Sequence, residues 1–383
     1  MTHFDVAIIG SGPSGASTAF QLAAKGIKTV IIEKSILPRY KTCGGGFVYR
    51  GRKLLPFALD NVIEKEFNTV EVHLGKKLHF STKREEPTIS MVMRDSFDHL
   101  ITQKAQELGA TLLENHKLTG LALHPEHLVL ETSKGNYTTN FVIAADGALS
   151  PTAKMAGWKE DTRKLIPALE YEVEVSEEDF KRWSEIVRFD IDAIPYGYAW
   201  SFPKKNHLSI GVASTKRTRL NLKKYYQEYL ENTLGIKNVL NEAQHGFQIP
   251  IAPRTDGFVK NNVFLIGDAA GFADPITAEG ISNAILSGNL VAEAILESKL
   301  NPDKAKALYL SKLEKNLLPE LQSGLWLSKW FYEQKTIRNI LLKKYGQHFS
   351  EAMADIFHGN RSYPKDIKNR IAQKLKGFVS LQN

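Results

Sequence analysis

The 383-residue sequence contains a single cysteine, Cys43. One thiol excludes an internal disulfide, a paired-thiol redox centre and a cysteine-rich zinc site, and it is compatible with a reducing cytoplasm. The sequence also lacks any run of about 18 apolar residues, and its first residues lack the basic segment and cleavage site of a secretory signal. We therefore expect a cytoplasmic protein whose only membrane contact would be peripheral, at the inner face.

The sequence has no run of five like charges, although 50 Lys and Arg residues outnumber 42 Asp and Glu residues and give a net charge of +8. The scattered basic residues are typical of a solvated surface, so we expect no nucleic-acid partner. Attraction to anionic lipid or to an acidic protein stays open. His124 and His127 are spaced like metal ligands, but without a third ligand they indicate a surface turn and no metal site.

A glycine-rich turn lies between a predicted strand at 4–9 and a predicted helix at 13–25. Gly10 permits a tight turn, Gly12 lets the backbone approach a pyrophosphate, and Gly15 lets the helix pack against the strand. The free N–H groups at the helix start suit phosphates, and an acidic residue about 20 positions later suits ribose hydroxyls. The pattern predicts a dinucleotide site at Gly10, Gly12, Pro13, Ser14, Gly15, Glu33 and Lys34, but FAD and NAD share it.

A second turn, at Gly267 and Asp268, follows a buried strand predicted at 263–266 and precedes a helix predicted at 279–296. A carboxylate at the end of such a strand can bind the hydroxyls of a flavin ribityl chain. The helix N-terminus at Gly280 and Ile281 can face the negative charge of the reduced isoalloxazine. An ordinary strand-to-helix turn is the alternative. The segment favours FAD as the cofactor.

These turns, together with two further motifs, resemble the large FAD family that includes aromatic hydroxylases, flavin halogenases and geranylgeranyl reductases. The further motifs are Arg94 before Phe97 and Asp98, and the segment Ala145-Asp146-Gly147-Ala148-Leu149-Ser150. The resemblance covers roughly residues 4–296 and implies that Arg94 contacts the cofactor and that Asp146 supports it. Many relatives carry an arginine where this chain has Lys154, so direct docking of NADPH stays open.

Two segments are similar to the geranylgeranyl reductases within that family. Cys43-Gly44-Gly45-Gly46 matches their CxGG motif, and residues 195–203 match their PxxYxWxFP motif. Alternating aromatic residues share one face of a strand and suit the wall of an apolar pocket, with an ordinary core face as the alternative. We expect cofactor contacts at Cys43, Gly44 and Gly45, and a substrate pocket at Tyr196, Tyr198, Trp200 and Phe202. The catalytic candidates are Cys43, Tyr198 and Trp200, although Cys43 alone could be a small buried residue.

The predicted fold class is α/β: a Rossmann-type FAD-binding domain with an inserted antiparallel-sheet substrate domain, as in glutathione-reductase-2-like flavoproteins, and a helical C-terminus. We expect residues 1–68, 94–157 and 257–300 to form the FAD domain. Residues 69–93 and 158–256 would form the substrate domain, and residues 301–383 the helical region.

The resemblance implies an FAD-dependent reductase that saturates C=C bonds of a polyprenyl, geranylgeranyl-like or similarly apolar substrate. The alternatives are a flavin-dependent monooxygenase or hydroxylase of an aromatic or polyene substrate, and a non-catalytic FAD-binding subunit. The Trp-x-Trp pair of the halogenases is absent. Because the sequence has one dinucleotide fingerprint, electrons would come from NADPH that docks transiently or from a ferredoxin-like protein. The substrate head group and the oligomeric state are not readable from the sequence.

Overall fold

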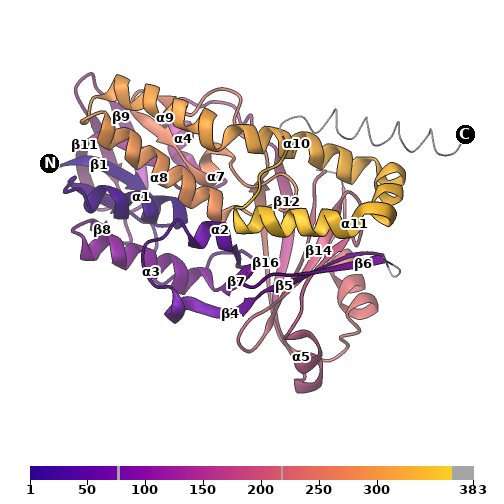
Figure 1. The fold of residues 1–383 in the computed structure, drawn as a ribbon. Coiled ribbons are helices and arrows are strands. Elements are labelled where there is room, and N and C mark those ends of the chain that lie inside the picture. Colours follow the sequence, from indigo (N-terminus) through magenta and orange to yellow (C-terminus); the bar gives the residue numbers. More distant parts are fainter. Residues whose placement is uncertain (76–77, 217–218, 365–383) are drawn as a thin grey trace, which may run out of the picture.

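The computed structural model describes residues 1–75, 78–216 and 219–364, and within these ranges two large sheets lie next to each other (Figure 1). The path through the first sheet is β17-β18-β11-β1-β2-β8, with β10 and β9 attached to β11. Strands β18, β11, β1, β2 and β8 are parallel, and β17, β10 and β9 are antiparallel additions. The strand bounds are β1 Thr2–Ile9, β2 Thr29–Ile32, β8 Thr111–Leu113, β9 Leu118–Leu123, β10 Leu128–Thr132, β11 Gly135–Ala144, β17 Val259–Lys260 and β18 Val263–Leu265.

Short apolar runs form the parallel strands because this part of the sheet is buried on both faces. Helix α1 (Pro13–Ala23) contacts β1 and β2 and packs between α3 (Arg94–Glu107) and α8 (Ile281–Glu297). Gly288 of α8 allows the close approach, since a Cβ there would lie 2.5 Å from the Ser14 carbonyl oxygen. Two segments more than 250 residues apart therefore fold together, as a shared site requires.

The second sheet has the order β16-β12-β15-β14-β13-β5-β6 and is antiparallel except between β13 and β5. Its aromatic face, defined by Tyr198, Trp200 and Phe202 of β14, belongs to one apolar cluster. The opposite face packs in another cluster with α5 (Glu177–Trp183) and α6 (Leu222–Glu228). The strand bounds are β5 Thr69–Leu74, β6 Leu78–Lys83, β12 Leu165–Val175, β13 Val187–Ile191, β14 Gly197–Pro203, β15 Leu208–Ser214 and β16 Val239–Pro250.

A third, smaller sheet of β3 (Gly46–Val48), β7 (Ile89–Val92) and β4 (Ile63–Phe67) follows the glycine loop at 42–46. The Val92 N–H donates to the Gly45 carbonyl at 2.9 Å, so this sheet anchors the loop. Short helices follow β3, β11 and β18: α2 (Tyr49–Arg52), α4 (Pro151–Met155) and α7 (Gly267–Ala270).

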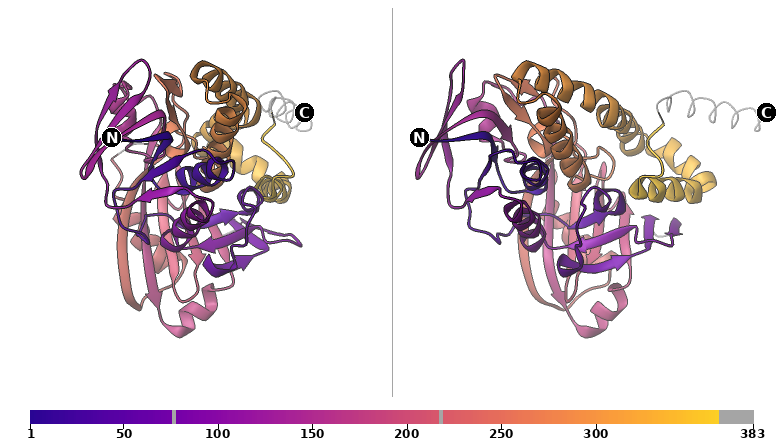
Figure 2. Two further views of the ribbon diagram at one scale, coloured as in Figure 1. Left: turned by 90° about the vertical axis from the view of Figure 1, so that its left-hand side faces the viewer. Right: turned by 60° about the vertical axis from the view of Figure 1, so that its left-hand side comes forward.

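Three C-terminal helices connect the two parts of the molecule: α9 (Pro302–Asn316), α10 (Leu318–Glu333) and α11 (Lys335–His358). Helix α9 packs on α8, and α10 and α11 continue toward the second sheet (Figures 1 and 2). Phe331, Tyr332 and Phe357 from these helices join the apolar cluster of the aromatic face. The last part of the expected helical region, residues 365–383, lies outside the described residues.

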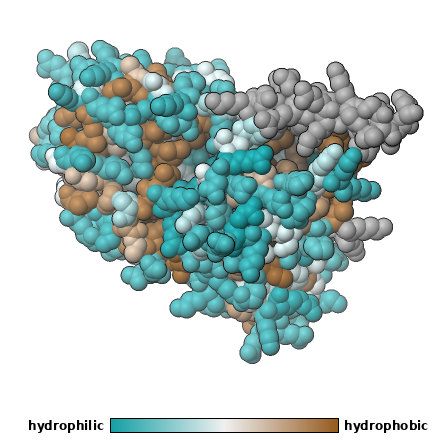
Figure 3. All heavy atoms as spheres, viewed as in Figure 1, coloured by the Kyte–Doolittle hydropathy of each residue, from teal (hydrophilic) through white to brown (hydrophobic). Residues whose placement is uncertain are grey.

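The predicted fold class is confirmed, with a Rossmann-type parallel sheet, a separate largely antiparallel sheet and C-terminal helices. The division into domains stays a proposal. Each helix of the described residues is too short or too polar to cross a membrane. On the face drawn in Figure 3, hydrophobic residues gather toward the side that holds α8, and hydrophilic residues cover most of the centre.

Candidate active site

A cavity of about 970 Å³ lies where the carboxyl ends of β1, β2, β11 and β18 meet the aromatic face of the second sheet. This edge of a parallel sheet is where α/β folds bind ligands. The cavity brings together most of the cofactor residues predicted from the sequence: Gly10, Gly12, Pro13, Ser14, Glu33, Lys34, Cys43, Gly44, Gly45, Arg94, Asp146, Asp268, Gly280 and Ile281.

Gly15 and Gly267, also predicted to bind the cofactor, lie behind the wall of the cavity. A Cβ on Gly15 would be 2.0 Å from the Gly10 carbonyl oxygen, and one on Gly267 would be 2.9 Å from Ser14 Oγ. Gly267 also has φ +52°, a left-handed value that favours glycine. These two glycines give the turns their shape, and their neighbours face the cavity.

The N-terminus of α1 is open toward the cavity. Its N-cap, Gly12, has no side chain, and its first turn has no acidic residue. By contrast, side chains cap the N-termini of two other helices: Ser176 caps α5 and Asn301 caps α9. A Cβ on Gly12 would meet only the Arg94 guanidinium, at 3.8 Å. The free N–H groups and the open approach fit a pyrophosphate.

Three cations line the cavity near this helix: Arg39, Lys41 and Arg94. Arg39 and Arg94 both pair with the buried Asp98 carboxylate, at 2.9 and 2.8 Å. Arg94 also contacts the half-buried thiol of Cys43. Burial and the neighbouring Arg94 lower the pKa of Lys41. The excess of positive charge suits a dianionic pyrophosphate. Sequence reasoning missed Arg39 and Lys41.

Glu33 keeps part of its hydrogen-bonding capacity. Its Oε2 accepts from the Ser11 N–H at 3.0 Å and the Ser11 hydroxyl at 2.7 Å, and its Oε1 accepts from the Ser35 N–H at 3.0 Å. A carboxylate offers about four acceptor positions, so one is left for a ribose hydroxyl. The geometry of Glu33 therefore permits it to bind a ribose hydroxyl, the role predicted from the sequence.

Asp146 and Asp268 differ in how they use their carboxylates. Asp146 accepts from the Ser150 hydroxyl at 2.6 Å and from the Thr152 N–H at 2.9 Å, so it holds the start of α4. Asp268 faces the cavity; burial raises its pKa, and Lys41 and Arg94 partly oppose that rise. Of the two, Asp268 is better placed to bind a hydroxyl of the cofactor.

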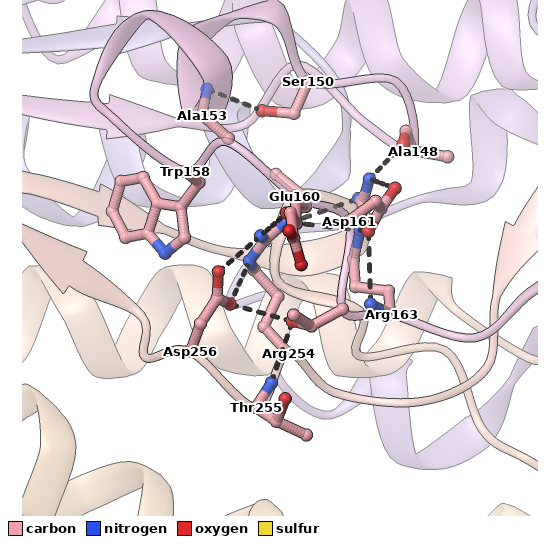
Figure 4. A network of polar contacts seen from close by, with 12 residues as sticks. Ala148, Ser150, Ala153, Trp158, Glu160, Asp161, Arg163, Arg254, Thr255 and Asp256 are labelled. Atoms are coloured by element: carbon pink, nitrogen blue, oxygen red, sulfur yellow. Dashed lines mark hydrogen bonds and ion pairs between the residues drawn. The ribbon is translucent and has the colours of Figure 1, made fainter.

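Arg163 and Arg254 form a network of polar contacts with Asp161 and Asp256 (Figure 4). Arg163 donates to the carbonyls of Asp268 and Ala148 at 2.6 and 2.7 Å and pairs with Asp161 at 2.7 Å. Arg254 pairs with Asp256 at 2.8 Å. The network joins the Asp268 turn to residues 161–163 and 254–256, which lie in two of the chain segments that run between the large sheets. Nothing in the local sequence marked these arginines as part of the site.

The side of the cavity formed by the second sheet is lined by rings. Tyr198, Trp200 and Phe202 follow one another with centroids 6.0 and 6.2 Å apart, and Phe189 of β13 adds a fourth ring. The Trp200 indole lies over Gly211, where a Cβ would be 2.2 Å from the ring. Its Nε1 is buried without a hydrogen-bond partner among the described residues. Tyr196 lies elsewhere, in the turn before β14, with its ring under Lys216 at 4.2 Å.

A smaller apolar chamber of about 60 Å³ adjoins the cavity and shares Phe189, Tyr198, Thr277 and Phe357 with it. Its other walls come from β5 and from helices α10 and α11. The Tyr198 hydroxyl donates to the Thr277 carbonyl, which fixes the ring between the two spaces.

The Cys43–Gly46 loop is held by a buried lysine. Lys204 Nζ donates to the carbonyls of Gly44 and Val92 at 2.7 and 3.0 Å. A Cβ on Gly44 would be 2.9 Å from Trp200 Nε1, and one on Gly45 would be 2.2 Å from Lys204 Nζ. The loop needs glycines because it is pressed between the aromatic wall and this lysine, which sequence reasoning did not find.

Within the described residues, no group of three or more His, Cys, Asp or Glu side chains could hold a metal ion. His124 and His127 lie in the turn between β9 and β10 and stack on each other, with ring centroids 5.2 Å apart.

Residues 3–298 match a family model described as an FAD binding domain. The chain is 29% identical to the chloroplastic geranylgeranyl diphosphate reductase of Arabidopsis thaliana, over 91% of this chain and 78% of that protein. It is 28% identical to the digeranylgeranylglycerophospholipid reductase of Thermoplasma volcanium, over 93% and 90%. A geranylgeranyl bacteriochlorophyll reductase-like protein of Thermoplasma acidophilum has the same fold, with TM-score 0.75, 24% identity, and coverage of 86% of this chain and 87% of that chain.

Proposed function

Because this chain belongs to the FAD-binding domain family and is an FAD-dependent oxidoreductase similar to geranylgeranyl reductases, we propose that it saturates C=C bonds of a polyprenyl or similarly apolar substrate. Bound and reduced, FAD supplies the hydride for such chemistry. The observation that carries the proposal is that the rings of Tyr198, Trp200 and Phe202 line the same cavity as the cofactor turns.

The residues on the first-sheet side of the cavity fit this cofactor. The open N-terminus of α1, with Arg39 and Arg94 beside it, would hold the pyrophosphate. The free acceptor position of Glu33 would take a ribose hydroxyl, and Asp268 a ribityl hydroxyl. The pyrophosphate would lie against the Gly12 backbone, in space that a side chain at this position would fill.

The aromatic side would bind and polarise the substrate. Each CH₂ group removed from water contributes about 0.8 kcal/mol, so a long prenyl chain binds well in the cavity and its apolar side chamber. An isolated alkene accepts hydride only when positive charge on its other carbon is stabilised. The faces of Tyr198 and Trp200 can do this by cation–π attraction of about 1–2 kcal/mol each. Burial raises the pKa of Tyr198, which keeps its ring neutral in this role. Cys43 stays a catalytic candidate at the edge of the same wall.

Two electron donors are candidates, because the sequence has no second dinucleotide fingerprint for a separate NADPH domain. With one dinucleotide fingerprint in the sequence, the protein would receive electrons from NADPH that docks transiently or from a ferredoxin-like protein. We propose a cytoplasmic enzyme that meets its lipid-like substrate at the inner face of a membrane.

The test uses purified protein loaded with FAD and reduced anaerobically with dithionite. Geranylgeranyl diphosphate is added, and mass spectrometry follows the gain of two hydrogens per saturated bond. We expect flavin reoxidation to track that gain. A parallel reaction with NADPH in air examines the oxygenase alternative. Oxygen insertion into the substrate, or no reduction by the reduced protein, would overturn the proposal.

A further inference from the structure

Two carboxylates interrupt the aromatic face of the second sheet. Glu170 and Glu172 are alternate residues of β12, so both point to the side that faces the cavity. Glu170 is only 2% exposed to bulk solvent, yet it lines the cavity. A carboxyl group in an otherwise apolar wall requires a specific reason, because burying its charge is costly.

Strand pairing sets Glu170 beside the aromatic wall. Glu170 pairs with Gly211 of β15, and Gly211 pairs with Trp200 of β14. Because the Trp200 ring extends over Gly211, the indole reaches toward the row that holds Glu170. The acid therefore borders the surface on which a substrate alkene would lie.

The Glu170 and Glu172 carboxyl groups lie close enough for a proton on one to bond the other. Glu172 Oε2 accepts from His207, whereas Glu172 Oε1 is buried and has no donor among the described residues. Glu170 lies within hydrogen-bonding reach of Glu172, so a proton on Glu170 is the donor that would satisfy this oxygen. Burial and the Glu172 charge raise the pKa of Glu170 to about 8. Burial also acts to raise the pKa of Glu172, but His207 and Lys204 outweigh it and lower that pKa.

Other polar groups lie around Glu170. Lys204, from the turn after β14, attracts both carboxylates while donating to the glycine loop. Tyr40 lies on the opposite wall, and burial together with Glu170 raises the pKa of its hydroxyl. His245 of β16 pairs with Glu170 in the sheet and stacks on the Tyr40 ring at 4.1 Å. Ser209 donates to Glu170 Oε1 at 3.4 Å.

A route leads from Glu170 to solvent. Glu172 Oε2 lies 3.0 Å from His207 Nε2, and the His207 side chain is 15% exposed. The Glu172 side chain is itself 12% exposed, so both members of this pair reach solvent.

We propose that Glu170 is the acid that protonates the alkene and that Glu172 and His207 return its proton from solvent. The inference rests on the proposed function. The alkene gains a hydride from the reduced cofactor on one carbon and a proton from Glu170 on the other. The cofactor is thereby oxidised by two electrons, and Glu170 is left as a carboxylate until water resupplies the proton through His207 and Glu172.

The first test needs neither cofactor nor turnover. Infrared difference spectra at neutral pH compare the protein with Glu170→Gln, a neutral variant of the same shape. We expect the carbonyl band of a protonated carboxylic acid that the substitution removes and that fades as the pH rises through about 8. Glu174→Gln is the matched control, because Glu174 lies on the same strand and face but is exposed. Absence of the band from the unsubstituted protein would overturn the inference.

The second test measures anaerobic reduction of geranylgeranyl diphosphate by dithionite-reduced, FAD-loaded protein. General-acid catalysis contributes typically about 10²–10⁴-fold, so Glu170→Gln should lower the rate at least about 100-fold. FAD and substrate affinity should stay unchanged, and the Glu174→Gln protein should react normally. The rate should fall above about pH 8 in the unsubstituted protein. His207→Gln should slow turnover, and added imidazole should restore it.

The outcomes separate the two claims. If the unsubstituted protein reduces the substrate and Glu170→Gln reduces it equally fast, the inference fails and the proposed function stands. If the unsubstituted protein reduces nothing, both fail, and the infrared band still reports whether the buried pair holds a proton.

Discussion

Where the cavity meets the first sheet, glycine turns bring main chain into its wall beside charged side chains, and where it meets the second sheet its wall is made of side chains. Gly10, Gly12 and Gly280 bring main chain to the cofactor side. On the substrate side, Trp200, Phe189 and Glu170 come from three different strands. A site built from main-chain groups needs glycines at fixed spacing along one turn. A site built from side chains on several strands needs those strands to pair in one register.

The largest expected effect tests the backbone side. Gly15→Val places a Cβ 2.0 Å from the Gly10 carbonyl oxygen, a contact with main chain that cannot rotate away. The turn must shift, at a cost of at least about 2 kcal/mol, and the N–H groups that would hold the pyrophosphate move with it. We expect purified protein without bound FAD, measured by its absorption spectrum and by titration with FAD.

The control for this substitution is Gly246→Ala on the exposed part of β16. A Cβ there meets its nearest neighbour at 3.7 Å, an ordinary contact, so FAD binding should not change. Normal FAD binding by Gly15→Val would show that the cofactor side tolerates a displaced backbone, and the contrast between the two sides would no longer hold.

The same contrast explains how much of the molecule could be predicted from sequence. The turns at Gly10 and Asp268, and the alternating rings of β14, were readable because each is a local pattern. The cations Arg39 and Lys41 were missed because no spacing rule connects a loop to the helix it faces. Tyr196 was expected in the pocket, yet the chain turns before β14 with φ +57° at this residue and carries its ring away. Glu170 was not predicted from the sequence, because its place beside Trp200 depends on the pairing of β12 with β15.

The second prediction tests the side-chain side. Trp200→Ala removes a buried ring and should lower the free energy of unfolding by about 3 kcal/mol. FAD affinity should change little, whereas the KM for a prenyl substrate should rise at least tenfold, equivalent to about 1.4 kcal/mol. Urea unfolding, FAD titration and steady-state kinetics measure the three quantities.

Tyr171→Ala is the matched control, because Tyr171 is 1% exposed on the opposite face of the same sheet and stacks on Tyr226 at 3.7 Å. It should cost similar stability without raising KM. Equal rises in KM for the two variants would mean that the effect comes from a weakened sheet and not from the wall of the cavity.

The third prediction concerns a side chain that supports the backbone side. Arg163→Lys keeps the charge but cannot reach the carbonyls of Asp268 and Ala148 and the Asp161 carboxylate together. We expect a loss of about 2 kcal/mol in the free energy of unfolding and weaker FAD binding. Lys104→Ala, which removes an exposed pair with Glu107, should cost less than about 0.5 kcal/mol. Unchanged FAD affinity in Arg163→Lys would show that the arginine network does not support FAD binding.

The last prediction concerns the acid at Glu170. Since the pKa of Glu170 is raised from 4.5 to about 8, folding binds its proton more tightly, and the associated stability is fully present at low pH. That stability should be lost as the pH rises toward about 8, by no more than about 1.4 kcal/mol per pH unit. Glu170→Gln, which cannot ionise, should not follow this slope, and Glu174→Gln should keep it. Urea unfolding of the FAD-free proteins across this range measures the difference. Parallel curves for Glu170→Gln and the unsubstituted protein would mean that Glu170 is ionised in the fold. The second-sheet side of the cavity would then carry a fixed negative charge at Glu170. We instead expect this side to be neutral and to face the cationic first-sheet side.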